Sequence, residues 1–398
     1  MNSKSSSPQP PAHGLRPTAY GLQPPTCFDL ILFSHVAYSG RRGRAHHFVE
    51  HLVKSHRVLW IDPPSSFLRN PSLRLARRTV SEALDVISLP GGIPGRNFAP
   101  VSELSQRYWA RRLRPLLRSW RDLTVPSVFL VQIPALWQTA RLLGADLRIY
   151  DSHDDWRLMP GNRPALIEAI ERHAAREADL VITASEELAA RFRSFGALPH
   201  DLPDACEFGD WAAADRVPPA PELRDLPRPR FLYFGGIDEC FDADALRALT
   251  EAFPSGSAIL VGQVADPHLA RLLQPMHGCL LLGERPYGQL PAFVAGADAL
   301  ILPFAITPRS RARDCVKLYE YLATGLPVIS TELPQLRRFP ALIEVAPKAE
   351  GPAGFARACQ RALAADTPER RAARKTAALE HTWARRVEAL ESLVNAAV

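Results

Sequence analysis

Residues 315–331 read CVKLYEYLATGLPVIST, and this stretch decides the fold of the second half of the chain. Leu318 and Leu322 are four residues apart, so on a helix they face one way. Gly325 suits the left-handed position that ends a helix, and Pro327 blocks continuation just before an apolar run. The stretch therefore predicts a short helix that ends at Gly325 and is followed at once by a buried strand.

Lys317 and Glu320 lie three residues apart on a neighbouring face of the same helix. In an open α/β sheet, helices that begin beyond strand carboxyl ends direct free backbone N–H groups at an anion in the crevice. Lys317 would add a positive charge there, and Glu320 could accept two hydrogen bonds from a vicinal diol such as a ribose. Spacing alone favours an exposed Lys–Glu pair, and the motifs described below reverse that preference.

Length and composition exclude several classes of protein. A chain of 398 residues exceeds the usual limit for one core, so two domains are expected. No run of 18 apolar residues occurs, and the first apolar segment, Phe28 to Val36, is short and contains Asp29 and Ser34. We therefore expect neither a secretion signal nor a membrane span. The six cysteines form no close pair, which argues against a zinc site or a disulfide framework and fits a reducing cytoplasm.

Strand-like and helix-like segments alternate in two series. Residues 1–26 are rich in Ser, Pro and Gln and are predicted to be disordered. The first series, residues 27–205, has expected strands at 28–36, 57–62, 86–89, 127–133, 147–153 and 180–185. After a Pro- and Ala-rich linker at 206–230, the second series, residues 231–380, has expected strands at 231–238, 258–263, 279–284, 299–304 and 327–331.

The fold class is therefore α/β, with two Rossmann-like domains facing each other across a cleft. A last amphipathic helix, Thr382 to Asn395 within residues 381–398, lies far enough along the chain to pack back on the first domain. The cleft between two such domains is the expected place for a ligand.

Five motifs follow the predicted strands of the second domain in order: GGID (Gly235–Asp238), VGQ (Val261–Gln263), LGERPYGQLP (Leu282–Pro291), the segment from Leu302 to Gly325, and PVIST (Pro327–Thr331). In this order they resemble the donor half of retaining GT-B glycosyltransferases of the group 1, family 4-like type, particularly bacterial enzymes of polysaccharide and teichuronic-acid assembly. The resemblance runs from about Phe28 to Val394 and is strongest over residues 231–331.

The resemblance implies a set of residues that bind a nucleotide-diphosphate sugar. Lys317 would neutralise the diphosphate together with the helix N-terminus, without a metal or cofactor, and Glu320 would bind the ribose. Arg309, Arg311 and Arg313 could assist. The remaining donor-binding candidates are glycines that allow close approach and residues of the loop bordering the base: Gly235, Gly236, Gly262, Arg285 and Tyr287.

Two positions depart from the family pattern. Ala312 stands eight positions before Glu320, where many relatives carry a second glutamate. The loop after the first donor-domain strand, GGIDECFDADA, contains only acids where many relatives place an Arg and a Lys. Phosphate binding would therefore fall more heavily on Lys317 and the nearby arginines.

The first domain offers polar residues at one strand end, in IYDSHDDW (Ile149–Trp156). By resemblance, His153, Asp154 and Asp151 are candidate catalytic or sugar-contacting residues, because a base is needed near the acceptor hydroxyl. A strand-end turn with a capping aspartate accounts for one acid but not for four polar residues. Arg44 and His47 match the family's first loop and helix on the acceptor side, although a solvated basic loop would look the same.

Arginine is concentrated at residues 105–123, where Trp109 and Trp120 interleave with six arginines. This composition fits equally a helix on an anionic membrane surface and an ordinary amphipathic helix with a solvated face. Nucleic acid is not expected as a partner, because no reader motif accompanies the basic residues.

Other functions are compatible with parts of the pattern. Asp242 and Asp244 could suggest a metal-binding DxD motif, but Asp242 more plausibly caps a helix beginning at Ala243. A non-catalytic sugar-nucleotide-binding subunit is the main alternative, and a sugar epimerase is a weaker one. The sequence favours a cytoplasmic enzyme, at the inner membrane face, that transfers a sugar from a nucleotide donor to a lipid-linked or polysaccharide acceptor.

Overall fold

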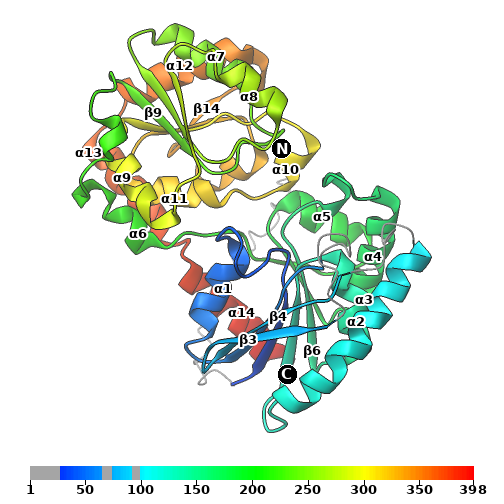
Figure 1. Ribbon diagram of the computed structural model, residues 1–398. Coiled ribbons are helices and arrows are strands. Elements are labelled where there is room, and N and C mark those ends of the chain that lie inside the picture. The colour runs from blue at the N-terminus through cyan, green and yellow to red at the C-terminus, as the bar shows by residue number, and fades with distance from the viewer. Residues whose placement is uncertain (1–26, 65–73, 92–98) are drawn as a thin grey trace, which may run out of the picture.

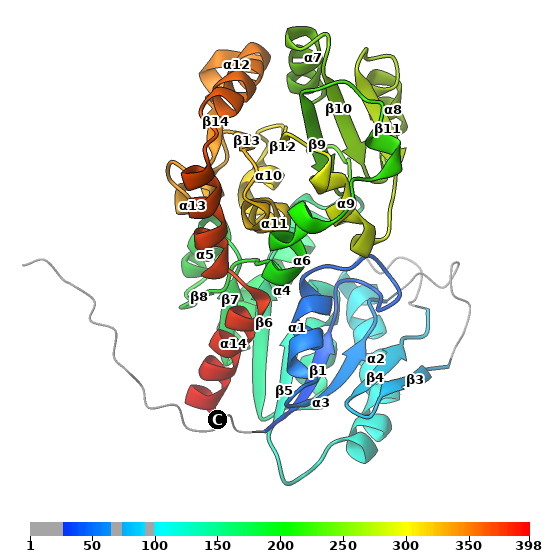
Figure 2. The same cartoon turned by 90° about the vertical axis from the view of Figure 1, so that its left-hand side faces the viewer.

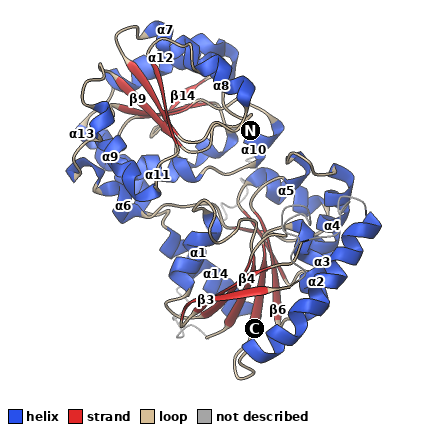
Figure 3. Ribbon diagram, viewed as in Figure 1, coloured by secondary structure: helices blue, strands red, loops and turns tan. Residues whose placement is uncertain are grey.

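A computed structural model of the protein describes residues 27–64, 74–91 and 99–398. The prediction for residues 1–26 therefore lies outside the described residues. The described chain forms two α/β domains, one above the other in Figure 1. Figure 3 shows that helices flank the strands of each domain. The α/β class with two Rossmann-like domains is thereby confirmed.

The first domain contains an eight-stranded sheet in the order β3-β4-β2-β1-β5-β6-β7-β8. Its pairings are parallel except that β3 runs antiparallel to β4. The strands are β1 (Asp29–Phe33), β2 (Arg57–Ile61), β3 (Ala76–Ser81), β4 (Leu84–Ser88), β5 (Ser127–Val131), β6 (Leu147–Ser152), β7 (Leu180–Thr183) and β8 (His200–Asp201). The exposed edge strand β3 was not predicted, since none of its side chains is buried and no apolar run marks it.

Helices cover both faces of this sheet. Its own helices are α1 (Arg44–Leu52), α2 (Ala99–Trp120), α3 (Trp137–Leu143), α4 (Pro164–Glu177) and α5 (Glu186–Ser194). On one face, Phe48 of α1 packs in a core with Phe28 and Trp60. On the other face, Trp109 of α2 packs with Trp137 and Tyr150. The carboxyl ends of the strands are therefore the part of the sheet left for polar residues.

The second domain contains a six-stranded parallel sheet in the order β11-β10-β9-β12-β13-β14. The strands are β9 (Arg230–Phe234), β10 (Ser257–Val261), β11 (Cys279–Gly283), β12 (Ala299–Leu302), β13 (Val328–Thr331) and β14 (Glu344–Ala346). The helices are α7 (Ala243–Ala252), α8 (Pro267–Leu273), α9 (Leu290–Ala295), α10 (Pro308–Ala312), α11 (Val316–Thr324), α12 (Gly351–Ala364) and α13 (Pro368–Leu379). Gly325 ends α11 in the left-handed conformation (φ +81°), as predicted.

The last helix, α14 (Trp383–Ala397), returns to the first domain and lies beside α1 (Figure 2). Trp383, Val387 and Leu390 are buried in the same core as Phe48. The prediction that the final helix packs back on the first domain is confirmed. Between the domains, residues 206–230 contain the short helix α6 (Phe208–Ala212), whose Trp211 is fully buried in the core of the second domain.

The structure shows which side chains of the arginine-rich segment are buried. Trp109 and Trp120 of α2 are only 1% and 5% exposed, so neither can insert into a membrane. They pack inward because they share the apolar face of the helix with Leu113 and Leu117. The arginines do lie outside: Arg107, Arg111, Arg112, Arg114 and Arg118 are all exposed. Among the described helices, none is long and apolar enough to cross a bilayer.

Candidate active site between the two domains

Lys317 lies in the first turn of α11, and its side chain extends across the end of β9. Its ammonium nitrogen is 5.4 Å from the ring centre of Tyr233 and 5.6 Å from that of Phe304. No ion pair involving this nitrogen occurs within the described residues. The two rings hold the cation in place without neutralising it. Lys317 therefore offers a full, half-buried positive charge at the strand ends.

Glu320, one turn further along α11, is 3% exposed. Tyr287 donates a 2.6 Å hydrogen bond to Glu320 Oε1, and the indole nitrogen of Trp211 donates to the Tyr287 oxygen at 3.1 Å. Burial raises the pKa of Glu320 to about 7, although Tyr287 and Lys317 act against that shift. An exposed Lys317–Glu320 pair is thus not what forms, because Glu320 faces inward.

Two strand-end glycines allow backbone segments to approach closely beside Lys317. Gly235 has φ +124°, a region that residues with a side chain rarely adopt. A Cβ on Gly235 would lie 2.1 Å from Lys317 Cε, and a Cβ on Gly262 would lie 1.8 Å from the Gly235 oxygen. Any side chain at these two positions would displace Lys317 or the neighbouring strand end.

Arg309 and Arg313, two of the three arginines predicted to assist Lys317, are engaged with acids. Arg309 pairs with Glu239 and lies 3.8 Å from Asp238, and Arg313 lies 3.7 Å from Asp238. Arg309 is only 15% exposed. The acidic loop that follows β9 therefore neutralises both arginines in this state, and their predicted contact with a donor would require these pairs to open.

His153 and Asp154 follow the carboxyl end of β6, and Asp154 lies near charged residues of the second domain. The charges of Arg313, Arg309 and Asp238 act on the Asp154 carboxyl. Burial raises the pKa of Asp154, whereas Arg313 and His153 lower it. Burial lowers the pKa of His153. In the described part of the chain, His153 Nε2 and Asp154 Oδ1 are buried without a hydrogen-bond partner. Buried polar atoms normally have partners, so both atoms are suited to meet a ligand.

The proton on His153 can be placed from its hydrogen bond. Nδ1 lies 3.3 Å from the backbone oxygen of Asp151, which can only accept, so Nδ1 carries the hydrogen. The free lone pair of the neutral ring is then on Nε2. With a lowered pKa the ring is neutral near pH 7, and Nε2 can accept a proton from a hydroxyl group.

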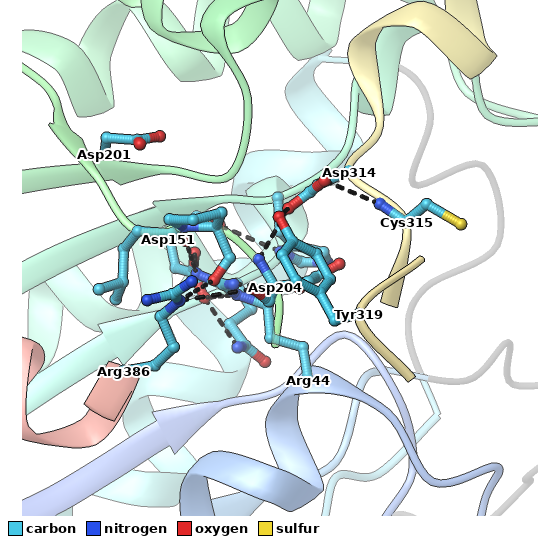
Figure 4. Close-up of polar contacts among 12 residues, drawn as sticks. Arg44, Asp151, Asp201, Asp204, Asp314, Cys315, Tyr319 and Arg386 are labelled. Carbon is cyan, nitrogen blue, oxygen red and sulfur yellow. Dashed lines mark hydrogen bonds and ion pairs between the residues drawn. The ribbon is translucent and has the colours of Figure 1, made fainter. Parts of the chain in front are cut away.

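Asp151 and Arg44, in contrast, are turned into the protein. Asp151 is fully buried, and its carboxylate accepts hydrogen bonds from Arg44 and Gln132. Arg44, 3% exposed, also pairs with Asp204 at 3.1 Å (Figure 4). Arg44 and Gln132 therefore satisfy the Asp151 carboxylate, and the candidate role of Asp151 beside His153 and Asp154 stays a prediction. Arg44 likewise does not lie open to an acceptor.

This buried cluster continues into the second domain. Asp314, just before α11, accepts hydrogen bonds from the backbone amide of Asp204 at 2.9 Å and from the Tyr319 hydroxyl at 2.7 Å (Figure 4). Arg386 of α14 donates to the Pro203 carbonyl at 3.1 Å. These residues thus connect the first sheet, the segment after β8, and α11. The connection fixes the backbone at His153 relative to the backbone at Lys317.

Two further predicted residues have partners outside this group. His47 is buried, bonds Glu207 at 2.9 Å through Nδ1 and stacks on Trp383, with the ring of Tyr287 6.1 Å away. Arg285 turns towards the linker, where it donates to the Leu282 carbonyl and lies 3.5 Å from Glu222. Both residues lie near the interface between the domains, but the His47 imidazole and the Arg285 guanidinium each already have a partner.

A largely apolar pocket of about 90 Å³ lies in the first domain, and its lining residue Trp156 contacts His153. Trp109, Ile133, Trp156 and Ile167 line it, and the ring of Trp156 meets the ring of His153 edge-on at 5.8 Å. The hydroxyl of Ser105, another lining residue, and the indole nitrogen of Trp156 are buried without partners among the described residues. The pocket could take a small apolar group carrying a polar atom.

The two aspartates of the DxD-like sequence, Asp242 and Asp244, make their contacts at the start of α7. Asp242 caps α7 by accepting hydrogen bonds from the backbone amides of Asp244 and Ala245 at 3.0 and 2.9 Å. Asp244 pairs with Arg247. The expected capping role of Asp242 is confirmed.

Sequence reasoning missed three residues of this region: Arg41, Trp211 and Asp238. Arg41 belongs to the first domain but contacts Gln263 and Glu284 of the second, and Trp211 holds Tyr287. The Arg41 contacts join residues more than 200 positions apart and the Trp211 contact joins residues 76 positions apart, so neither leaves a local signal. For Asp238, the acidic composition of its loop was the available signal.

We compared the sequence and the structure with those of known proteins. No protein-family model matches the chain. The chain is 24% identical over 280 residues, 64% of its own length and 69% of the relative's, to TuaH of Bacillus subtilis (strain 168), named as a teichuronic acid biosynthesis glycosyltransferase.

Two solved structures show the same fold. One is described as trehalose-6-phosphate from E. coli bound with UDP-2-fluoro glucose, with TM-score 0.70, 12% identity, and coverage of 92% of this chain and 98% of that chain. The other is a trehalose-6-phosphate synthase studied for glycosyltransfer with retention, with TM-score 0.67, 12% identity, and coverage of 93% and 99%. The chain therefore has the two-domain GT-B fold.

Proposed function

We propose that the protein is a glycosyltransferase that moves a sugar from a nucleotide-diphosphate donor to a lipid-linked or polysaccharide acceptor in cell-surface polysaccharide biosynthesis. The observation that carries this proposal is the placement of Lys317 and Glu320. An unpaired ammonium and a buried carboxylate follow one another on α11 at the carboxyl edge of a Rossmann-like sheet. Their chemistry matches a diphosphate and a ribose diol, respectively.

The reaction follows from these positions. The bond between the anomeric carbon and the diphosphate oxygen breaks, and its electron pair leaves with the diphosphate, where Lys317 stabilises the new charge. An acceptor hydroxyl forms the new bond to the anomeric carbon. Its proton passes to His153 Nε2, the neutral imidazole nitrogen without a partner. Asp154 would contact the transferred sugar. We infer retention of configuration, which requires the acceptor hydroxyl to approach the anomeric carbon from the face that the diphosphate leaves, and we infer independence of metal ions for this transfer.

The acceptor class is inferred from the first domain and from the relative. TuaH is named for teichuronic acid biosynthesis, which supports a polysaccharide role. The apolar pocket beside His153 would suit an acceptor with an apolar part. The exposed arginines of α2 would attract an anionic membrane surface and place the enzyme at the inner face of the cytoplasmic membrane.

Calorimetric titration with a panel of nucleotide sugars, beginning with UDP-sugars, tests the proposal. The parent should bind at least one, and Lys317→Ala should weaken that binding by about thirtyfold, because a charge-assisted contact is worth on the order of 2 kcal/mol. Lys348→Ala, which removes an exposed lysine from the same domain, is the matched control. If both variants bind like the parent, the donor assignment is contradicted.

Sugar transfer to a membrane extract separates this function from its alternative. An enzyme should incorporate labelled sugar and release a nucleotide. Binding without transfer would instead indicate a non-catalytic sugar-nucleotide-binding subunit.

A further inference from the structure

Two cationic side chains from different domains lie against the neighbouring glycines 235 and 236. Lys317 of the second domain occupies the space where a Cβ on Gly235 would project. Arg41, from the loop before α1 in the first domain, lies beside Gly236: a Cβ there would be 2.9 Å from Arg41 Nη1. The two-glycine segment at the end of β9 is therefore flanked by one positive side chain from each domain.

Arg41 also reaches the ends of two other strands in the second domain. Its Nε donates to Glu284 Oε1 at 2.9 Å, and its Nη2 donates to Gln263 Oε1 at 3.4 Å. Gln263 follows β10 and Glu284 follows β11. The guanidinium thus lies over the carboxyl edge of the sheet that carries Lys317, although it belongs to the opposite domain.

A phosphate could recruit Arg41 with less disruption than Arg309. The side chains of Arg41 and Glu284 are 50% and 53% exposed, and an ion pair that water reaches so fully contributes little to stability. Arg309, in contrast, is 15% exposed and faces both Asp238 and Glu239.

The local sequence strengthens this comparison. Residues 237–244, which follow Gly236, contain four acids and no lysine or arginine. The loop cannot itself supply positive charge to an anion at the strand end. A second cation for such an anion must come from elsewhere in the structure.

We propose that Arg41 completes the diphosphate site by exchanging Glu284 for the phosphate oxygens of the donor. This inference rests on the proposed function, since it assumes that a nucleoside diphosphate binds beside Lys317. The planar guanidinium can donate two parallel hydrogen bonds to a phosphate, whereas Lys317 acts as a point charge. Because Arg41 belongs to the first domain, the donor would contact both domains when it binds.

The test is calorimetric titration of the full-length protein with UDP. Arg41→Ala should weaken UDP binding by about tenfold. Glu284→Gln, which keeps the size of the side chain and removes its charge, should leave binding unchanged or strengthen it, because the competing carboxylate is gone. Arg172→Ala is the matched control: its side chain is 47% exposed and also pairs with a glutamate, Glu168.

The opposite effects of the two cleft variants make the test decisive. If the Arg41–Glu284 pair only ties the domains together, both substitutions should weaken binding equally, and that result would overturn the inference. Lys317→Ala separates this failure from failure of the proposed function. Weakening by Lys317→Ala but not by Arg41→Ala would reject the role of Arg41 alone, whereas no effect of either would reject a diphosphate at this place.

Discussion

The phenol of Tyr287 donates a 2.6 Å hydrogen bond to Glu320 Oε1, so a residue of the loop after β11 is in direct contact with the second turn of α11. Trp211 holds the same phenol from the linker at 3.1 Å. A ribose diol binding to Glu320 would offer two hydroxyl donors where Tyr287 now offers one. The carboxylate is thus kept satisfied, and its orientation fixed, before a nucleotide arrives.

Donor affinity should rise with pH through about 7. Burial raises the pKa of Glu320 to about 7, and only the ionised carboxylate accepts hydrogen bonds from both hydroxyls. Since apparent affinity scales with the competent fraction, binding of a nucleotide sugar should tighten by about tenfold from pH 6 to pH 8. Calorimetry across that range measures the effect.

Two variants control this prediction. Glu320→Gln cannot ionise, so its weakened binding should not vary with pH. Tyr287→Phe removes a hydrogen bond that lowers the pKa of Glu320, so the midpoint of the profile should move upwards. A flat profile in the parent protein would contradict the assignment of Glu320 to the diol.

Arg44→Ala should destabilise the protein by about 3–5 kcal/mol, the usual result of removing one partner from a buried ion pair. Arg44 is 3% exposed, and its loss leaves the fully buried Asp151 with Gln132 as its remaining side-chain partner. The free energy of unfolding in urea measures the change. Arg107→Ala is the control, because Arg107 and its partner Glu103 are 59% and 53% exposed; it should cost less than about 1 kcal/mol. Equal effects of both substitutions would argue against the buried pair.

Thermal stability should fall between pH 6 and pH 8. Burial and the neighbouring Asp314 raise the pKa of Asp204 against the attraction of Arg44, and burial raises the pKa of Glu320 to about 7. An acid with a raised pKa binds a proton on folding, so its stabilising contribution is present at low pH and is lost as pH rises through about 7. Scanning calorimetry should therefore show a smaller decline for Asp204→Asn. A decline as steep as in the parent would mean that other groups control this window.

The sequence predicted the elements of the fold better than the directions of its side chains. The helix at Lys317, its glycine end and the following strand were all legible, because periodicity and turn residues are local signals. The sequence left open whether Trp109 and Trp120 face the core or the solvent, since composition does not say which face of a helix meets a core. The contacts of Arg41 and Arg44 depend on residues more than 100 positions away. The strand β14 was not predicted, because it is too short to appear as an apolar run in the sequence.

Sugar transfer should survive a strong chelator. Lys317 supplies positive charge at the leaving group, and Asp242 is committed to capping α7. Among the described residues, the group that could hold a metal ion consists of His47, Glu50 and Glu207, whose ligand atoms lie within 4.8 Å of one another. Transfer assays with and without EDTA measure the effect, and Asp244→Asn should be as active as the parent. Loss of activity that manganese or magnesium restores would contradict the metal-independent reaction.

Binding to anionic membranes should depend on the outer face of α2 and on its arginines alone, because Trp109 and Trp120 are buried. Each arginine near an anionic surface contributes about 1 kcal/mol, and salt should weaken the total. Replacing Arg111 and Arg118 with glutamate should abolish co-sedimentation with phosphatidylserine vesicles at low salt while leaving UDP binding unchanged. Arg114 is better spared, since it donates to the Leu142 carbonyl.

A charge-matched control is available in the second domain. Arg271 and Arg337 are exposed there, and replacing both with glutamate changes net charge by the same amount. If this control loses vesicle binding to the same extent, attraction depends on total charge and not on α2. If the parent does not sediment with the vesicles at low salt, the arginine face of α2 is a solvated surface, and the acceptor must reach His153 from solution.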